Sequence, residues 1–211
     1  MKLRGKTAVF IDWANVYGWR TSLKKEVSPD KLYKYLKEYA LVKEINFYYG
    51  IDKHPKSKKF LNEVKKIGFN VASKEVKYIP ITLDSSHFKD LAREVKDALT
   101  LIRNIDIKIV ERILQILDRK VWRRKCDFDM EIAVDCLKEF NRYDSYIFFS
   151  GDGDFEPLYK FLIGLKKQVI VIYASGHLGR EVWSLRKGIF KTEIDNLPVL
   201  QKNVPPVSRG A

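Results

Sequence analysis

Short runs of apolar residues alternate along the chain with longer segments in which apolar residues recur every three or four positions. The runs predict buried strands at residues 7–12, 45–49, 69–78, 146–149, 169–173 and 189–194. The periodic segments predict helices at residues 28–39, 60–67, 129–140, 155–166 and 179–186. Strands that alternate with helices favour a mainly parallel central sheet covered on both faces, which is a three-layer α/β/α domain.

A less regular stretch at residues 81–124 interrupts this alternation. We predict a helical insertion there, with two helices joined near residues 104–106, inside a single domain of residues 1–200. A disordered tail is predicted at residues 201–211. The insertion suits a nucleic-acid clamp, a dimer arm or a lid. The helical spacing is carried by Leu91, Val95, Leu99 and Ile102, and then by Ile109, Ile113, Ile116 and Leu117.

Two of the predicted strands run directly into aspartates. Asp12 ends the strand at residues 7–12, and Asp152 follows the strand at residues 146–149. Ligands of parallel sheets bind at the carboxyl ends of strands, where the strand order reverses. If these two strands are neighbours there, acids from distant parts of the sequence meet in one crevice. Asp12 also suits a simple capping or turn role.

Asp152 and Asp154 lie in the segment S-G-D-G-D-F, where two glycines let the chain turn sharply. Asp154 has the alternative role of capping the following helix, whereas Asp152 is harder to explain structurally. The segment is not an EF-hand loop, because the later ligands and the closing glutamate are missing. We therefore predict that both aspartates bind metal or act in catalysis.

The predicted helix at residues 129–140 carries further acids. Asp129 falls inside its apolar stripe, so the carboxylate points into the domain near the start of the helix. Asp135 projects away from the stripe, one turn from Glu131, and this like-charge pair is unfavourable unless a cation relieves it. A solvated position is the alternative for Asp135. The sequence leaves open whether Asp127 binds metal.

Carboxylates gathered in this way suit a hard divalent cation. Mg²⁺ and Mn²⁺ take oxygen ligands and keep several of their waters. Two such ions can activate a water and stabilise the leaving oxygen of a phosphodiester. We therefore expect Mg²⁺ or Mn²⁺ as the cofactor.

The net charge of +13 favours a polyanion as partner, although charge alone does not separate RNA, DNA and an anionic membrane. No apolar run approaches the length that spans a bilayer. Residues 119–125 combine cations with one tryptophan just before the acids, and a solvated helix end is the alternative interpretation. We predict nucleic-acid contact for Arg119, Lys120, Trp122, Arg123, Arg124 and Lys125.

Three segments, taken in order, resemble the motifs of one family. F-I-D-W-A-N at residues 10–15 resembles the F-I-D-x-x-N opening of NYN domains. K-C-D-F-D-M-E-I-A-V-D at residues 125–135 resembles their K-G-x-D-x-x-L-A-x-D. S-G-D-G-D-F-E-P-L at residues 150–158 resembles their S-G-D-x-D-F-x-P-L. The resemblance covers residues 7–50 and 125–195.

The chain is thus similar to the LabA-like group of NYN proteins, within the PIN-like nuclease superfamily. This resemblance implies a PIN-like fold with an acidic metal pocket, and a role in RNA processing or decay. Trp13 and Cys126 depart from the family pattern, which has a small or polar residue and a glycine there. The resemblance assigns the metal pocket to Asp12, Asp129, Asp135, Asp152 and Asp154, and it places Asn15 beside them as a further catalytic residue.

The resulting hypothesis is a metal-dependent ribonuclease that hydrolyses RNA phosphodiesters. The alternative is a catalytically inactive RNA-binding or scaffold protein with the same fold. RNA is the expected partner, DNA and a homodimer are left open, and the absence of an export signal predicts a cytoplasmic protein. Cys126 and Cys136 form no zinc pattern, and the sequence has no Walker A or dinucleotide-binding motif.

Overall fold

The structure is a computed structural model that describes residues 1–81, 93–95, 97–99, 108–109, 111–113 and 121–202. The chain divides into two compact units. The core unit consists of Met1–Glu75 and Cys126–Ala211, and the insertion unit consists of Val76–Lys125. Each unit is described by itself.

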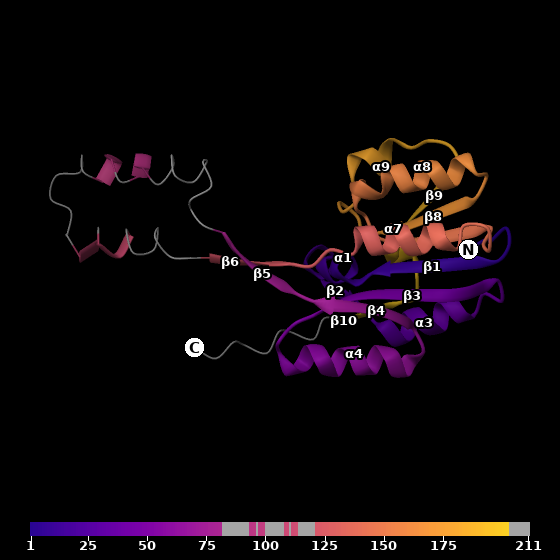
Figure 1. Cartoon of the computed structure of the whole chain (residues 1–211), viewed down its shortest axis with the longest axis horizontal. Helices are drawn as coiled ribbons and strands as arrows, with labels where there is room; N and C mark the ends of the chain where they lie inside the picture. Colours follow the sequence, from indigo (N-terminus) through magenta and orange to yellow (C-terminus); the bar gives the residue numbers. More distant parts are fainter. Residues whose placement is uncertain (82–92, 96, 100–107, 110, 114–120, 203–211) are drawn as a thin grey trace. The chain divides into compact units, whose positions relative to one another are not determined.

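The core unit is built on a six-stranded sheet in the order β4-β3-β1-β7-β8-β9 (Figure 1). All neighbouring strands in this sheet are parallel, as the sequence pattern predicts. β1 lies between β3 and β7, so the strand order reverses at β1. The strands are β1 (Thr7–Asp12), β3 (Val42–Ile51), β4 (Asn70–Glu75), β7 (Ser145–Phe149), β8 (Gln168–Tyr173) and β9 (Ile189–Glu193).

Helices cover both faces of this sheet, which confirms the three-layer α/β/α prediction. Figure 1 shows α3 and α4 on one side of the sheet and α7, α8 and α9 on the other. The first face carries α1 (Trp13–Gly18), α3 (Pro29–Lys37) and α4 (Pro55–Ile67), and the second carries α7 (Asp129–Lys138), α8 (Glu156–Gly164) and α9 (Arg180–Ser184). The core unit also contains α2 (Arg20–Leu23), η1 (Gly153–Phe155) and η2 (Ile194–Asn196).

The central strands are buried along their whole length because they supply side chains to both helical layers. In β1, Val9 and Ile11 join the hydrophobic cluster beneath α1 and α3, whereas Ala8 and Phe10 join the cluster beneath α7 and α8. Burial on both faces explains why these strands read as continuous apolar runs.

The insertion unit begins with an antiparallel ribbon of β5 (Lys77–Ile81) and β6 (Val121–Lys125). The predicted single strand at residues 69–78 is therefore wrong beyond Glu75, since β4 and β5 are separate strands. The prediction of a helical insertion is also wrong at residues 121–124, which form a strand. Their pairing partner lies far away in sequence, so the local pattern does not reveal the strand. Of the predicted helical positions, Val95, Leu99, Ile109 and Ile113 lie in helical turns, and Leu91, Ile102, Ile116 and Leu117 lie outside the described residues.

The first two residues of the predicted tail, 201 and 202, belong to a strand of the fold. Leu200–Lys202 form β10, which pairs antiparallel with β2 (Lys25–Val27), and residues 203–211 lie outside the described residues. Within the described part of the chain, no helix has the length and apolar character needed to cross a membrane.

Candidate metal site

The candidate site lies at the carboxyl ends of β1 and β7, the neighbouring strands at the centre of the sheet. β1 ends at Asp12, and β7 continues into the turn at residues 150–154 that carries Asp152. Parallel pairing aligns Ile11 with Phe149, so both segments leave the sheet at the same edge. Acids separated by most of the sequence therefore meet at one edge of the sheet.

Asp12 is a buried acid with a structural role of its own. Its side chain is only 7% exposed and caps α1, with Oδ1 accepting hydrogen bonds from the backbone N–H groups of Ala14 (3.1 Å) and Asn15 (3.3 Å). Burial raises the pKa of Asp12 to about 6, and the negative charges of Asp129 and Asp152 act in the same direction. The cap lowers this pKa but does not outweigh burial.

Three further carboxylates converge beside Asp12. One oxygen each from Asp129, Asp152 and Asp154 lies within 4.8 Å of the other two. These three residues are called the acidic cluster below. Asp129 is the first residue of α7, and Asp152 caps η1 by accepting a hydrogen bond from the backbone N–H of Asp154 (3.0 Å). Two of the three acids thus come from a single turn, and the third comes from a helix on the same side of the sheet.

The electrostatics of Asp129 reflect this crowding. The pKa of Asp129 is raised to about 6. Partial burial is the largest cause, and the negative charges of Asp152, Asp127 and Asp154 act in the same direction. The positive charge of Lys74 opposes this shift. A divalent cation would relieve the repulsion between these carboxylates.

Asn15 fixes the relative positions of α1 and the turn after β7. Its Oδ1 atom accepts hydrogen bonds from the indole N–H of Trp19 (2.9 Å) and from the backbone N–H of Gly151 (3.2 Å). The predicted catalytic asparagine therefore stands beside the acids, with its amide oxygen held by two protein donors.

Asp135 lies apart from the acidic cluster. Its carboxylate accepts hydrogen bonds from the Tyr48 hydroxyl (3.1 Å) and from Nζ of Lys138 (3.1 Å). The adjacent Glu131 pairs with Lys74. The like-charge pair that the helix spacing revealed is thus relieved by two lysines, one on each acid.

Trp13 does not occupy the pocket, although it follows Asp12 directly. Its side chain is buried in the core on the α4 side of the sheet, with ring centroids 4.9 Å from Phe47 and 5.3 Å from Phe60. The departure from the family pattern at this position is therefore accommodated by packing.

Lys74, near the end of β4, is a site residue that sequence reasoning missed. Its Nζ contacts the Glu131 carboxylate and lies 4.5 Å from the ring centroid of Phe128, directly before Asp129. A lysine at the carboxyl end of a strand was the available signal, but the Lys-rich composition hid it.

The turn that carries Asp152 and Asp154 packs against the loop after β8. The backbone N–H of Gly179 donates to the carbonyl of Gly151 (2.8 Å). A methyl group built on Gly151 would lie 1.6 Å from the carbonyl oxygen of His177, and one built on Gly153 would lie 2.3 Å from Oε2 of Glu181. Gly151 is therefore needed for the close approach of the two backbones, whereas at Gly153 the end of the Glu181 side chain could move aside.

The predicted nucleic-acid segment belongs to the insertion unit. Arg119 and Lys120 lie outside the described residues. The backbone of Trp122, Arg123, Arg124 and Lys125 forms most of β6, and Lys125 is exposed. Contact between this segment and nucleic acid stays a prediction.

Comparison with known families identifies the architecture that carries these acids. The model of the NYN domain matches residues 6–100 and 84–187. The chain belongs to the NYN domain family. The three sequence motifs recognised above lie within the matched residues, and the resemblance to NYN proteins is thereby confirmed.

A curated relative and a solved structure show further likenesses, of sequence and of fold. The low amplitude and bright protein LabA of Synechococcus elongatus is 28% identical over 91 residues, which is 43% of this chain. The chain spans about half, 49%, of the length of that relative. A crystal structure of a protein of unknown function from Vibrio parahaemolyticus has a TM-score of 0.60 at 19% identity, over 95% of this chain and 100% of the other. The family is of PIN-like nuclease type.

The residues of the pocket fit a divalent metal ion. The acidic cluster offers only carboxylate oxygens, which are the donors that Mg²⁺ and Mn²⁺ prefer. The fully buried hydroxyl of Tyr159 has no hydrogen-bond partner, alone among the buried side-chain polar atoms of the described residues. Its pKa lies well above its usual range, through burial first and then the charge of Asp152. A buried, unpaired donor that feels the charge of Asp152 suits a site that also holds water.

Proposed function

We propose that this protein is a metal-dependent ribonuclease that hydrolyses RNA phosphodiesters at the acidic cluster. The observation that carries the proposal is the convergence of Asp129, Asp152 and Asp154, with carboxylate oxygens within 4.8 Å of one another, in a chain of the NYN family. Buried Asp12 stands next to them and adds a fourth negative charge.

The acidic cluster would hold Mg²⁺ or Mn²⁺, with Asp12 as a further ligand, directly or through water. Such an ion lowers the pKa of a bound water and neutralises charge on a phosphodiester. The chain positions the acids through structures that are independent of the ion. Asp12 and Asp152 are held as caps of α1 and η1, and Asn15 ties these two elements together. Asp135 is held by Tyr48 and Lys138, and we assign it no direct contact with the ion.

RNA is the proposed substrate because the protein is strongly basic outside the pocket. The net charge is +13, and cations exceed acids in both the core unit and the insertion unit. Cations supply the sequence-independent grip on a phosphate backbone. Contact by residues 119–125 and a cytoplasmic location are part of this proposal, and the oligomeric state is left open.

The experiment is a cleavage assay on labelled single-stranded RNA with EDTA, Mg²⁺ or Mn²⁺. We expect cleavage only with metal, and we expect its loss in Asp152→Asn. Asp30→Asn is the matched control, because Asp30 is an exposed acid of α3 paired with Lys34. The same assay on labelled DNA of equal sequence tests the preference for RNA.

Two results would count against the proposal. Cleavage that survives in a folded Asp152→Asn protein would show that the activity belongs to another site or to a contaminant. RNA binding without cleavage in Mg²⁺, Mn²⁺ and Co²⁺ would instead support an inactive RNA-binding protein on the same fold.

A further inference from the structure

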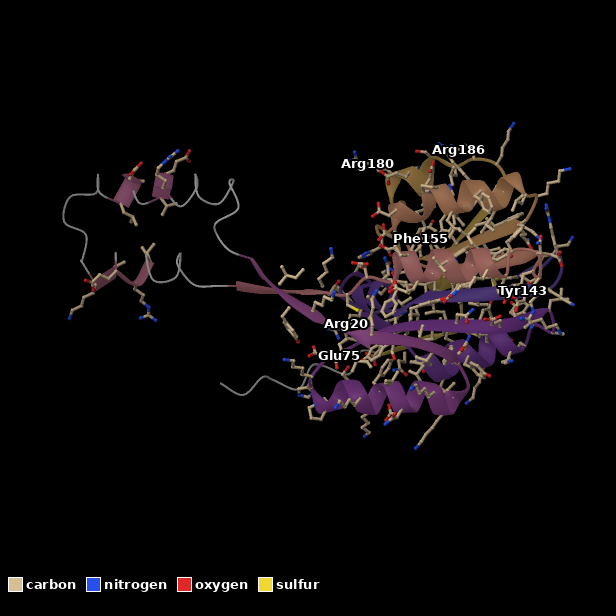
Figure 2. All side chains as sticks on the ribbon, viewed as in Figure 1. Arg20, Glu75, Tyr143, Phe155, Arg180 and Arg186 are labelled. Atoms are coloured by element: carbon tan, nitrogen blue, oxygen red, sulfur yellow. The ribbon has the colours of Figure 1, made fainter. Side chains whose placement is uncertain are left out.

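A second basic surface with an exposed aromatic residue lies on the core unit, at α9 and β9. Trp183 is 55% exposed, although it is one of the largest apolar side chains. Arg186 and Lys187 follow α9 and are exposed, and Lys191 lies on β9. These four residues are called the Trp183 patch. Figure 2 shows Arg180 and Arg186 on the α9 side of the core unit, at the start of α9 and just beyond its end.

Lys191 fixes the geometry of the patch. Its Nζ atom donates to the backbone carbonyls of Trp183 (2.8 Å) and Leu185 (2.7 Å), so it caps the carboxyl end of α9. The same atom lies 5.6 Å from the centroid of the Trp183 ring. Partial burial lowers the pKa of Lys191, and the charge of Arg186 lowers it further. Two cations held close to each other favour the approach of an anion.

The start of α9 is anchored to the turn that carries Asp152 and Asp154. Gly179, which precedes α9, donates its backbone N–H to the Gly151 carbonyl (2.8 Å). Glu181, in the first turn of α9, lies against Gly153. The start of α9, which leads into the Trp183 patch, is therefore positioned by the same turn that carries two members of the acidic cluster.

We propose that the Trp183 patch binds single-stranded RNA, with a base stacked on Trp183 and phosphates held by Arg186 and Lys187. This inference rests on the proposed ribonuclease function and names a binding surface for its substrate. Aromatic rings interleaved with cations bind single strands without sequence preference, because every base has a face to stack.

The composition of the patch favours this partner over a protein. The cores of protein interfaces are depleted of charged residues, whereas here one aromatic ring has a lysine beside it and two exposed cations close by in sequence. Duplex nucleic acid keeps its bases stacked within the helix and offers no free base to Trp183. Phe190, an exposed aromatic of β9, points to the opposite face of the sheet from Lys191 and does not extend the patch.

The test is fluorescence anisotropy of a labelled single-stranded RNA of about 12 nucleotides, within the usual site-size range for single-strand binding. The full chain carries Asp152→Asn and is measured in EDTA, so that cleavage cannot contribute. Trp183→Ala should weaken binding about 5- to 150-fold at every salt concentration. Arg186→Gln should flatten the plot of log affinity against log salt by up to about 0.7.

Two matched controls come from the same protein. Phe190→Ala removes a similarly exposed aromatic, at 50% exposure, from the other face of β9. Arg142→Gln removes an exposed cation that pairs with Glu139 after α7. Both should bind RNA like the parent. A Trp183→Ala variant with parental RNA affinity would overturn the proposal. An equal loss of RNA affinity in Phe190→Ala would also overturn it. So would a change in the sedimentation of the Trp183→Ala protein without RNA, because the loss of affinity would then reflect altered folding or assembly.

The outcomes for the patch and for the ribonuclease can be told apart. If Trp183→Ala weakens binding but the parent chain never cleaves RNA with metal, the ribonuclease proposal fails and the binding surface stands. If the parent cleaves and Trp183→Ala neither binds more weakly nor raises the KM for cleavage, the surface fails and the ribonuclease proposal stands.

Discussion

Asp12 both caps α1 and places a buried negative charge beside the acidic cluster. Its pKa in the folded protein, about 6, lies above the ordinary value of 3.8. A carboxyl group with a raised pKa binds its proton more tightly in the folded chain than in the unfolded chain. Its stabilising contribution is therefore complete below pH 4 and is lost as the pH rises through about 6. At neutral pH the ionised Asp12 destabilises the metal-free fold.

Asp12→Asn should therefore be more stable than the parent at pH 8 in EDTA. Asparagine caps a helix as well as aspartate does, so the charge is the main difference. A shift of this size corresponds to on the order of 2–3 kcal/mol at pH 8 and to little at pH 4. Urea unfolding at both pH values measures it.

Millimolar Mn²⁺ should make the parent more stable than Asp12→Asn at pH 8, because an ion that binds only the folded parent stabilises it by mass action. A variant that is less stable than the parent in EDTA at pH 8, or equally stabilised by Mn²⁺, would contradict a carboxylate site at Asp12.

Tyr159 gives a second test at the scale of a residue. Its hydroxyl is buried without a partner, whereas the buried hydroxyl of Tyr146 donates to the carbonyls of Phe140 (3.1 Å) and Glu139 (3.3 Å). Tyr159→Phe should stabilise the protein in EDTA by about 1 kcal/mol, and Tyr146→Phe should destabilise it by a similar amount. Melting temperatures of both variants check the signs.

With Mn²⁺ present, Tyr159→Phe should show a smaller rise in melting temperature than the parent, if the hydroxyl donates to a water held in the pocket. Equal losses of stability in Tyr159→Phe and Tyr146→Phe, with and without Mn²⁺, would show that the Tyr159 hydroxyl has an ordinary structural partner.

At the scale of elements, the site depends on backbone packed against backbone. The turn between β7 and η1 approaches the loop after β8 so closely that no Cβ fits at Gly151. By contrast, a Cβ on Gly164, the last residue of α8, would contact no atom within 4 Å. The two glycines offer a matched pair with opposite expectations.

Gly151→Ala should cost about 2 kcal/mol or more, because the methyl group overlaps the His177 carbonyl and the turn must move. The displaced turn should also reduce the gain in melting temperature with Mn²⁺. Gly164→Ala should be neutral or stabilise by up to about 1 kcal/mol. Denaturant unfolding with and without Mn²⁺ measures both, and a parental Mn²⁺ response in Gly151→Ala would show that the turn does not position the ligands.

At the scale of the whole molecule, the chain folds as two compact units whose connection is a two-stranded ribbon. Tyr78 pairs with Arg124 across that ribbon. Replacing residues 79–123 with Asn-Gly should therefore leave a short hairpin, since this dipeptide suits a two-residue turn between antiparallel strands. All members of the acidic cluster remain in the shortened chain.

The shortened chain should unfold cooperatively and keep its rise in melting temperature with Mn²⁺. Its RNA affinity should fall, and its salt dependence should weaken by up to about 0.7 for each lost phosphate contact, if the cations at residues 119–125 hold the backbone. Anisotropy titrations over several salt concentrations check this. Unchanged affinity and slope would place RNA binding on the core unit alone, and a chain without a cooperative transition would show that the core unit needs the insertion.

Most of the architecture and part of the candidate site were predictable from local pattern. The apolar run of β1 ends at an aspartate, and that of β7 is followed by a glycine and an aspartate. Because the carboxyl ends of parallel strands share one edge of the sheet, these acids could be expected to meet there. Asp129 was predictable because a helix with a known apolar stripe orients its own side chains. The β5–β6 ribbon was not, because the two strands lie far apart in sequence and their pairing leaves no local periodicity to detect.

The sequence by itself determined which acids stand at the ends of elements, the order of layers, and membership in the NYN family, because these depend on short-range spacing and motifs. Only the tertiary structure decided that Asp135 is taken by Tyr48 and Lys138, that Lys74 neighbours Asp129, and that Lys191 holds Trp183. The contacts of Tyr48 with Asp135 and of Lys74 with Asp129 join elements that are distant in sequence. The physical reason is that side-chain partners across a fold follow from how layers pack, and packing is a property of the whole core.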